Sequence, residues 1–157
     1  MDPLQELREI EAIKALKHRY MRSIDTKDWD LMRRCFVPDA TTAYSGGKYA
    51  FSGIEAIMQF MVESMDRGSF LSSHRVTQPE IALTSETSAT GIWALEDYVV
   101  DTKHEITIHG AAFYHDRYVK VDGEWKIQHT GYERTFEQMG SRKGQGWTVT
   151  QRAFEEE

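Results

Sequence analysis

The second half of the sequence contains four long runs with the composition of β-strands. These runs are HRVTQPEIAL, ATGIWALEDYVV, HEITIHGAAFYHDRYVKV and EWKIQHTGYERTF. Only TSETS, DTK and the Asp122-Gly123 pair separate them, and an Asp-Gly pair is a strong signal for a tight hairpin turn. Because strands joined by such short turns pair with their neighbours in the chain, the second half predicts an antiparallel meander.

The first half has a helical pattern instead. Apolar residues recur at intervals of three or four along one face of the first segment: Leu4, Leu7, Ile10, Ile13, Leu16, Tyr20 and Ile24. A short helix is predicted from about Asp28 to Cys35, with Thr26 as its cap, and TTAYSGGKYAF predicts a hairpin. Ser52 and Glu55 have the spacing of a capping box, which predicts a third helix. Helices followed by a meander indicate an α+β fold, in which a curved sheet with helices against its concave face would enclose a pocket.

A chain of 157 residues suits a single domain with its own hydrophobic core. We expect this domain to span residues 1–140 and the polar segment 141–157 to be an irregular tail, with Trp147 docked.

The net charge of −6 argues against nucleic acid and anionic membranes as partners, and no apolar run approaches the ~20 residues of a membrane span. Cys35 is the only cysteine and the acidic N-terminus lacks the pattern of a signal peptide, which together predict a cytoplasmic protein.

Asp97 shares one face of its predicted strand with large apolar residues. Alternation in ATGIWALEDYVV places Trp93, Leu95 and Val99 on the same side as Asp97. Apolar surroundings raise the pKa of a carboxylic acid unless a cation is near, and such groups are frequent in active sites. The competing interpretation is a residue at the end of a strand that turns to solvent, because Asp101 follows closely.

His74, Tyr20 and Asp25 are further candidate functional residues. A histidine titrates near neutral pH, so its imidazole can both accept and donate a proton. By default, His74 is a partly buried histidine with satisfied hydrogen bonds, and Tyr20 is a core aromatic residue whose hydroxyl needs a partner. Asp25 stands where the first helix ends, so ordinary capping also explains it.

The side on which Arg134 lies depends on the register of the last strand. Unbroken alternation in EWKIQHTGYERTF groups Arg134 with Lys126, whereas a bulge at Gly131 would bring it onto the face of Trp125. The residues themselves leave both registers open. A solvated guanidinium at the rim of the sheet is the simplest interpretation.

The segment HEITIH does not predict a metal site. A zinc signature of this type needs two histidines at positions i and i+4 of a helix. His104 and His109 are instead five residues apart in a strand-like run, so they face opposite sides. No P-loop or dinucleotide motif is present either, and the sequence predicts no metal.

Taken in order, several segments of the chain resemble the SnoaL-like branch of the NTF2-like superfamily. They are IEAIKALKHRYMRSIDTKDWD, YSGGK, SATGIWALEDY, GAAFYHDRY, VDGEWKI and TGYERTFE, and they span about residues 9–138. Within this branch they are most similar to the bile-acid 7α-dehydratases, and more distantly to scytalone dehydratase and hexachlorocyclohexane dehydrochlorinase. The resemblance implies an α+β NTF2-like cone, with a curved antiparallel sheet wrapped around a long N-terminal helix and a deep apolar pocket. It also implies a homotrimer, or alternatively a dimer, and no cofactor.

The same resemblance implies a set of catalytic residues. Its tyrosine and aspartate fall on Tyr20 and Asp25, its histidine on His74, its second aspartate on Asp97 and its arginine on Arg134. His74 would then be the base, with either Asp25 or Asp97 as its partner and Tyr20 as a hydrogen-bond donor. A place for Arg134 in the pocket favours the bulge at Gly131.

The implied function is that of a cofactor-independent dehydratase, a carbon–oxygen lyase. Its substrate would be a small apolar polycyclic or aromatic compound, such as a 7-hydroxy-3-oxo-Δ4 steroid. One alternative is another lyase or isomerase on the same scaffold, which eliminates formaldehyde or hydrogen halide from an aromatic or alicyclic compound. The other is a non-catalytic module that binds a small ligand, although such a module has no use for five matched ionisable or hydroxyl residues.

Overall fold

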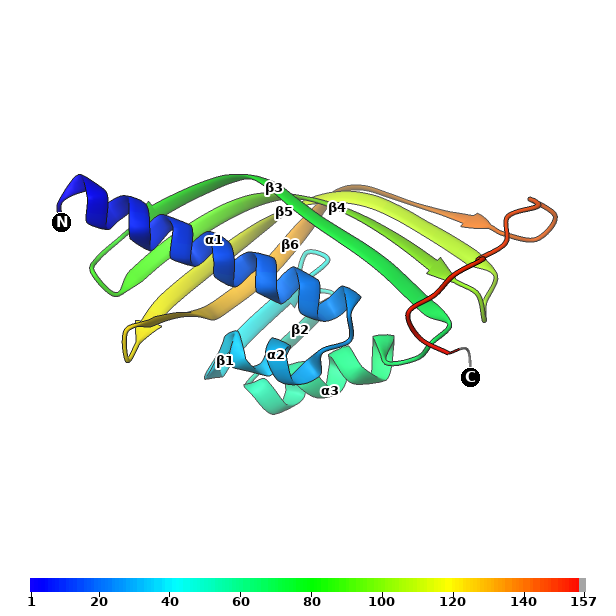
Figure 1. Cartoon of the computed structure of the whole chain (residues 1–157), viewed down its shortest axis with the longest axis horizontal. Coiled ribbons are helices and arrows are strands. Elements are labelled where there is room, and N and C mark those ends of the chain that lie inside the picture. The colour runs from blue at the N-terminus through cyan, green and yellow to red at the C-terminus, as the bar shows by residue number, and fades with distance from the viewer. Residues whose placement is uncertain (156–157) are drawn as a thin grey trace.

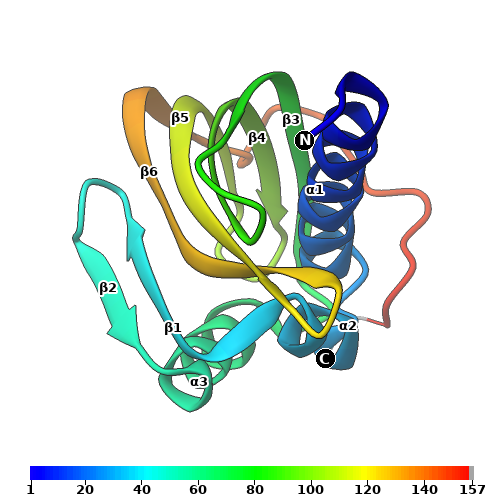
Figure 2. The same ribbon diagram turned by 90° about the vertical axis from the view of Figure 1, so that its left-hand side faces the viewer.

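A curved sheet of six strands wraps around one long helix in the computed structural model, which describes residues 1–155 (Figure 1). The elements in chain order are α1 (Pro3–Asp25), α2 (Trp29–Arg34), β1 (Phe36–Tyr44), β2 (Tyr49–Ser52), α3 (Ile54–Met65), β3 (Phe70–Leu83), β4 (Ser88–Asp101), β5 (Ile106–Val121) and β6 (Glu124–Ser141). The strands have the order β2-β1-β6-β5-β4-β3 in the sheet. Figure 2 shows α1 beside β3, with α2 and α3 at the lower end of the molecule. The predicted α+β arrangement is confirmed.

The four strand-like runs form the predicted antiparallel meander, from β3 to β6. In its last turn Asp122 and Gly123 have φ values of 51° and 82°, as a tight hairpin requires. The shorter hairpin predicted at TTAYSGGKYAF is present as β1 and β2. The whole sheet is nevertheless mixed, because β1 pairs with β6 in parallel. β6 is the last strand of the meander, and this pairing satisfies backbone groups along an edge that would otherwise be open.

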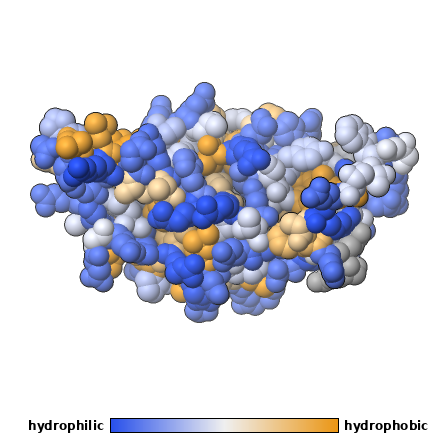
Figure 3. Space-filling model, in the orientation of Figure 1, coloured by the Kyte–Doolittle hydropathy of each residue, from blue (hydrophilic) through white to orange (hydrophobic). Residues whose placement is uncertain are grey.

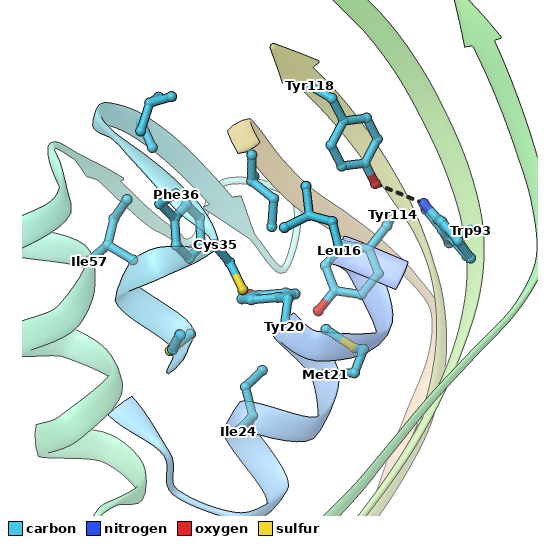
Figure 4. Packing of buried hydrophobic residues seen from close by; sticks show 14 of the residues in the cluster. Leu16, Tyr20, Met21, Ile24, Cys35, Phe36, Ile57, Trp93, Tyr114 and Tyr118 are labelled. Carbon is cyan, nitrogen blue, oxygen red and sulfur yellow. Dashed lines mark hydrogen bonds between the residues drawn. The ribbon is translucent and has the colours of Figure 1, made fainter. Parts of the chain in front are cut away.

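Helix α1 follows the predicted apolar stripe and forms the centre of the core. Asp2 caps the helix by accepting hydrogen bonds from two backbone N–H groups of the first turn, at 2.9 and 3.0 Å. From Ile13 onward the stripe is buried, and it packs with apolar residues of the sheet and of α3 (Figure 4). The first turns of α1 lie at one end of the molecule, where Leu4 and Leu7 are 58% and 60% exposed. Figure 3 shows apolar groups in orange at this end.

Two predicted helix caps are wrong. Asp28, rather than Thr26, caps α2 by accepting a hydrogen bond from a backbone N–H at 2.9 Å. Helix α3 begins after Gly53, which has a φ of 89° and provides no side-chain cap. Glu55 forms no capping box, because its carboxylate pairs with the guanidinium of Arg33 on α2 at 2.6 Å.

The chain after β6 forms neither helix nor strand in residues 142–155, while the last two residues of the predicted tail lie outside the described part. The predicted docking of Trp147 is wrong, since this side chain is 75% exposed. The tail contacts the domain further along, where the Lys27 ammonium lies 5.0 Å from the centre of the Phe154 ring. Within residues 1–155, none of the helices combines the length and the apolar character needed to cross a membrane.

Candidate active site

Asp25 and His74 form a hydrogen-bonded pair where the end of α1 meets β3. Asp25 Oδ1 lies 2.7 Å from His74 Nδ1 and accepts a second bond from the Ser72 hydroxyl at 2.9 Å. Its other oxygen accepts the backbone N–H of His74 at 2.8 Å. An ionised carboxylate can only accept, so the ring hydrogen lies on Nδ1 and the lone pair on Nε2. The imidazole is thus held in the tautomer and orientation that a general base needs.

Asp97 on β4 does not contact His74 through a hydrogen bond but pairs with Arg134 on β6. The two guanidinium nitrogens meet the two carboxylate oxygens, with 2.9 Å between Nη2 and Oδ2. Burial alone would lower the pKa of the Arg134 guanidinium, but the hydrogen bonds and charge of Asp97 outweigh it and hold this pKa above its usual range. The predicted alternation of β4 is confirmed, because Trp93, Leu95 and Val99 are buried together with Asp97.

The strand register places these two pairs side by side. His74 on β3 and Asp97 on β4 are direct cross-strand partners. Directly opposite residues in an antiparallel pair point to the same face of the sheet, with their Cβ atoms about 5 Å apart. The histidine–aspartate pair and the arginine–aspartate pair therefore belong to one continuous polar wall.

A bulge in β6 brings Arg134 to this wall, but not at the predicted residue. His129 pairs with Arg117 and Ile127 with Tyr118, which leaves Gln128 as the extra residue that flips the side chains as far as Arg134. A second register shift follows at Thr135, because Arg134 pairs with Ala112 and Phe136 with Ala111. Gly131, where the bulge was predicted, lies instead against β1. A Cβ at this position would be 2.6 Å from the carbonyl oxygen of a residue on that strand, so close packing explains the glycine.

Gly110 on β5 is a site residue that the sequence reasoning missed. It is the cross-strand partner of Asp97, and Arg134 passes over it to reach that carboxylate. A Cβ at Gly110 would lie 2.5 Å from Arg134 Nη1, which is closer than any real contact of this kind. The missing side chain therefore leaves room for the Arg134 guanidinium to lie over β5 beside Asp97.

We expect Gly110→Ala to push the Arg134 guanidinium away from Asp97 and to leave a buried carboxylate without its partner. An unsatisfied charged group of this kind costs about 1–3 kcal/mol of unfolding free energy, measurable by denaturant titration. The matched control is Gly140→Ala, because a Cβ at Gly140 meets nothing within 4 Å. Equal stability of the two variants would contradict this account of Gly110.

Beside these two pairs, four tyrosines line the same cavity and together form a tyrosine floor: Tyr20, Tyr44, Tyr114 and Tyr132. The hydroxyls of Tyr20 and Tyr44 are 2.7 Å apart, and burial raises the pKa of both phenols. The Tyr114 hydroxyl has no hydrogen-bond partner within residues 1–155, although the residue is only 2% exposed. Figure 4 shows the Tyr114 and Tyr20 rings close to each other in the core. Burial raises the pKa of Tyr114 as well, so the phenols of Tyr20, Tyr44 and Tyr114 remain neutral donors at physiological pH.

A buried ion pair lies against the ring of one of these tyrosines, Tyr114. Lys17 Nζ lies 2.7 Å from Asp116 Oδ2, and both side chains are completely inaccessible to solvent. The same ammonium is 3.3 Å from the centre of the Tyr114 ring, which is a close cation–π contact. Burial lowers the pKa of Lys17, and the charge of Asp116 offsets part of that effect.

A cavity of about 310 Å³ collects most of these groups, which is near the lower end of the ~300–1,000 Å³ usual for small-molecule sites. Four predicted site residues line it: Tyr20, His74, Asp97 and Arg134. The other walls are largely apolar or aromatic and include Ile24, Tyr44, Phe60, Met61, Met65, Phe70, Val99, Ile108 and Tyr114. Asp25, the fifth predicted residue, lines a separate pocket with His74 and holds the imidazole from that side.

The fold is shared with several solved structures. A protein from Novosphingobium aromaticivorans that is provisionally named a scytalone dehydratase has a TM-score of 0.79 and 24% identity, over 85% of this chain and 88% of that one. A type 2 hexachlorocyclohexane dehydrochlorinase, LinA, has a TM-score of 0.80 and 18% identity, over 89% and 94% of the two chains. Rv3472 from Mycobacterium tuberculosis, a protein of unknown function, has a TM-score of 0.73 and 25% identity, over 85% and 76%.

These similarities confirm the predicted NTF2-like fold, with the long N-terminal helix against a curved, mixed sheet. Two of the three neighbours carry the names of lyases, one a dehydratase and one a dehydrochlorinase. Residues 5–131, most of the chain, match the SnoaL-like domain family. This protein is therefore a member of the SnoaL-like domain family.

Proposed function

We propose that this protein is a cofactor-independent lyase that removes water from an apolar polycyclic substrate, with a 7-hydroxy-3-oxo-Δ4 steroid as the first candidate. The observation that carries the proposal is the Asp25–His74 pair. Three hydrogen bonds to the carboxylate oxygens of Asp25 hold this side chain in place. One of the three, at 2.7 Å, comes from His74 Nδ1 and leaves His74 Nε2 to accept a proton. His74 also lines the cavity in which a substrate would lie.

The reaction that suits such a base is an elimination next to a conjugated ketone. His74 Nε2 removes a proton from the carbon between the double bond and the carbon bearing the hydroxyl group. The electron pair of that C–H bond enters the conjugated system, and negative charge develops on the ketone oxygen. When this electron pair moves back from the ketone oxygen into the carbon chain, the C–O bond breaks. The hydroxyl group takes the proton from His74 and leaves as water. The product gains one carbon–carbon double bond, and His74 is neutral again once it has supplied that proton.

The tyrosine floor is suited to the ketone oxygen. Tyr20 and Tyr44 share one hydrogen bond, so one of the two phenolic hydrogens is still available to a ligand. Tyr114 offers another, and the Lys17 ammonium against its ring makes that phenol a better donor. Donors placed where negative charge develops typically contribute a large part of the rate enhancement, about 10²–10³ for a single donor.

The apolar walls favour an apolar substrate. Aliphatic and aromatic side chains from α1, α3 and the strands surround the polar groups, and they would bury rings without offering them hydrogen bonds. Arg134 pairs with Asp97 and, at 3.3 Å, with Glu137, which also lines the cavity, so this wall is polar and holds one more carboxylate than guanidinium. An uncharged polycyclic compound with one ketone and one hydroxyl group fits this distribution.

The test is to mix the purified protein with a 7α-hydroxy-3-oxo-Δ4 steroid and record the absorbance of the longer conjugated dienone. Mass spectrometry checks for the loss of one water molecule. We expect product with the wild-type protein and none above background with His74→Ala. Binding of the steroid without any product would reject the dehydration and leave a ligand-binding role.

Elimination of hydrogen halide or formaldehyde uses the same base and cavity, so it is the second candidate function. Its support is the shared fold with LinA, at a TM-score of 0.80. A panel of halogenated alicyclic and hydroxymethyl aromatic compounds, assayed beside the steroid, separates the leaving groups. Turnover of a halogenated compound together with an inert steroid would favour this second candidate.

A further inference from the structure

A second and larger cavity, of about 690 Å³, lies outside the active site. It is a groove between the middle of α1, the end of α2 and the turn that joins β5 to β6. It shares none of its lining residues with the active-site cavity. In Figure 1 this region lies below α1, near the hairpin of β5 and β6, and Figure 3 shows strongly hydrophilic residues in dark blue across the middle of the same face.

The groove is basic although the protein is acidic. Five cationic side chains and two carboxylates line it, a local excess of three positive charges in a chain with a net charge of −6. The cationic residues are Arg8, Arg19, Arg34, Lys120 and Lys126. Such a local reversal of sign attracts anions to this face.

Both lysines already have partners, whereas the arginines do not. Lys120 pairs with the buried carboxylate of Glu9 at 2.6 Å, and Lys126 contacts Glu124 at 3.1 Å. The guanidinium groups of three arginines form no ion pair or side-chain hydrogen bond within residues 1–155: Arg8, Arg19 and Arg34. The excess charge of the groove therefore lies on groups whose donors are free to bind a ligand.

Arg19, Arg34 and Lys126 line the groove together with the buried Cys35. Burial raises the pKa of Cys35, and the charges of these three cations and of Arg22 act in the opposite direction. The Lys126 ammonium also donates a hydrogen bond to the backbone carbonyl of Arg34 at 2.9 Å. Arg8 lies eleven residues before Arg19 on α1, or about 16 Å along the helix axis.

We propose that this groove binds a small phosphate-bearing ligand, with the phosphate at Arg19 and Arg34 and the remainder along α1 toward Arg8. Guanidinium groups match phosphate oxygens in a two-pronged geometry, and charge-assisted bonds of this kind are about twice as strong as neutral ones. The length of the groove suits a nucleotide-sized molecule. The acidic remainder of the surface disfavours a long polyanion such as RNA.

The test is isothermal titration calorimetry of the whole chain at low ionic strength with inorganic phosphate, adenosine 5′-monophosphate and adenosine. We expect the two phosphate compounds to bind and adenosine not to bind. Tighter binding of the monophosphate assigns the groove to phosphate esters, and equal binding assigns it to phosphate itself. Added salt should weaken both interactions.

Variants then locate the site. Arg19→Ala and Arg34→Ala should each weaken phosphate binding about tenfold, the equivalent of one lost charge-assisted contact. The control is Arg117→Ala, an exposed arginine of β5 that does not line the groove. The proposal is overturned if adenosine binds as well as its monophosphate, if neither phosphate compound binds, or if the control and the groove variants weaken binding equally. None of these results depends on lyase activity.

Discussion

Replacement of His74 by alanine is expected to lower turnover of the steroid about 10²–10⁴-fold, the usual contribution of a general base. The side chain is the one imidazole that lines the active-site cavity within residues 1–155. The fold should survive, because the bond from the His74 backbone N–H to Asp25 does not involve the side chain. The rate of dienone formation measures the activity, and thermal unfolding checks the fold.

His115→Ala provides the matched control for this variant. His115 is exposed on β5 and does not line the active-site cavity, so its loss should leave turnover unchanged. If His74→Ala kept most of its activity, or lost no more than His115→Ala, His74 would not be the base.

Lys17→Met is expected to have the largest effect on stability, a loss of about 3–5 kcal/mol in the free energy of unfolding. Removal of the ammonium leaves the completely buried Asp116 carboxyl group without the cation that lies 2.7 Å from it. The tyrosine floor would also lose the cation beneath Tyr114. Urea denaturation monitored by tryptophan fluorescence measures the change.

Two further variants separate the buried charge from the loss of a lysine as such. Lys17→Met combined with Asp116→Asn removes both charges while it keeps an acceptor for the Tyr118 hydroxyl, and should recover much of the lost stability. Lys14→Met, at a partly exposed lysine of α1, should change stability by less than about 1 kcal/mol. A double variant no more stable than Lys17→Met would show that the cost does not come from the unpaired carboxylate.

The sequence pattern predicted the order of elements because local periodicity governs it. The stripe of α1 and the alternation of β4 are both visible in a window of about a dozen residues, and both are confirmed. The parallel pairing of β1 with β6 was not visible, because it joins residues such as Thr42 and Thr130 that are far apart in the chain. No local pattern states which distant strand will cover an open edge.

The candidate site was predictable as a set of residues but not as a set of pairs. Asp25 and His74 are 49 positions apart, and only the packing of α1 against β3 decides that this carboxylate, and not Asp97, meets the imidazole. The position of the bulge in β6 is another such case, since Gln128 carries no sequence signal for it. Gly110 could have been found, because a glycine inside a strand often marks a close approach of other atoms.

The sequence pattern gave a weaker indication of the contact between Lys17 and the Tyr114 ring than of Gly110. Lys17 lies four residues after Ile13 and three before Tyr20, so it falls on the buried stripe of α1. A lysine at such a position must find an anion in the core, and Asp116 is that anion in the structure. Its sequence distance from Lys17 makes the partner impossible to name from the sequence alone.

Proton exchange tests the role of His74 most directly, because it is independent of the leaving group. A 3-oxo-Δ4 steroid that lacks the 7-hydroxyl group cannot lose water, but it can still be deprotonated and reprotonated at the carbons of its conjugated system. In deuterium oxide, we expect the wild-type protein to introduce deuterium into this compound, detected by mass spectrometry, and His74→Ala to show only the uncatalysed rate. Equal deuterium uptake with both proteins, or none with a wild-type protein that dehydrates the hydroxylated steroid, would contradict a mechanism in which His74 removes the proton.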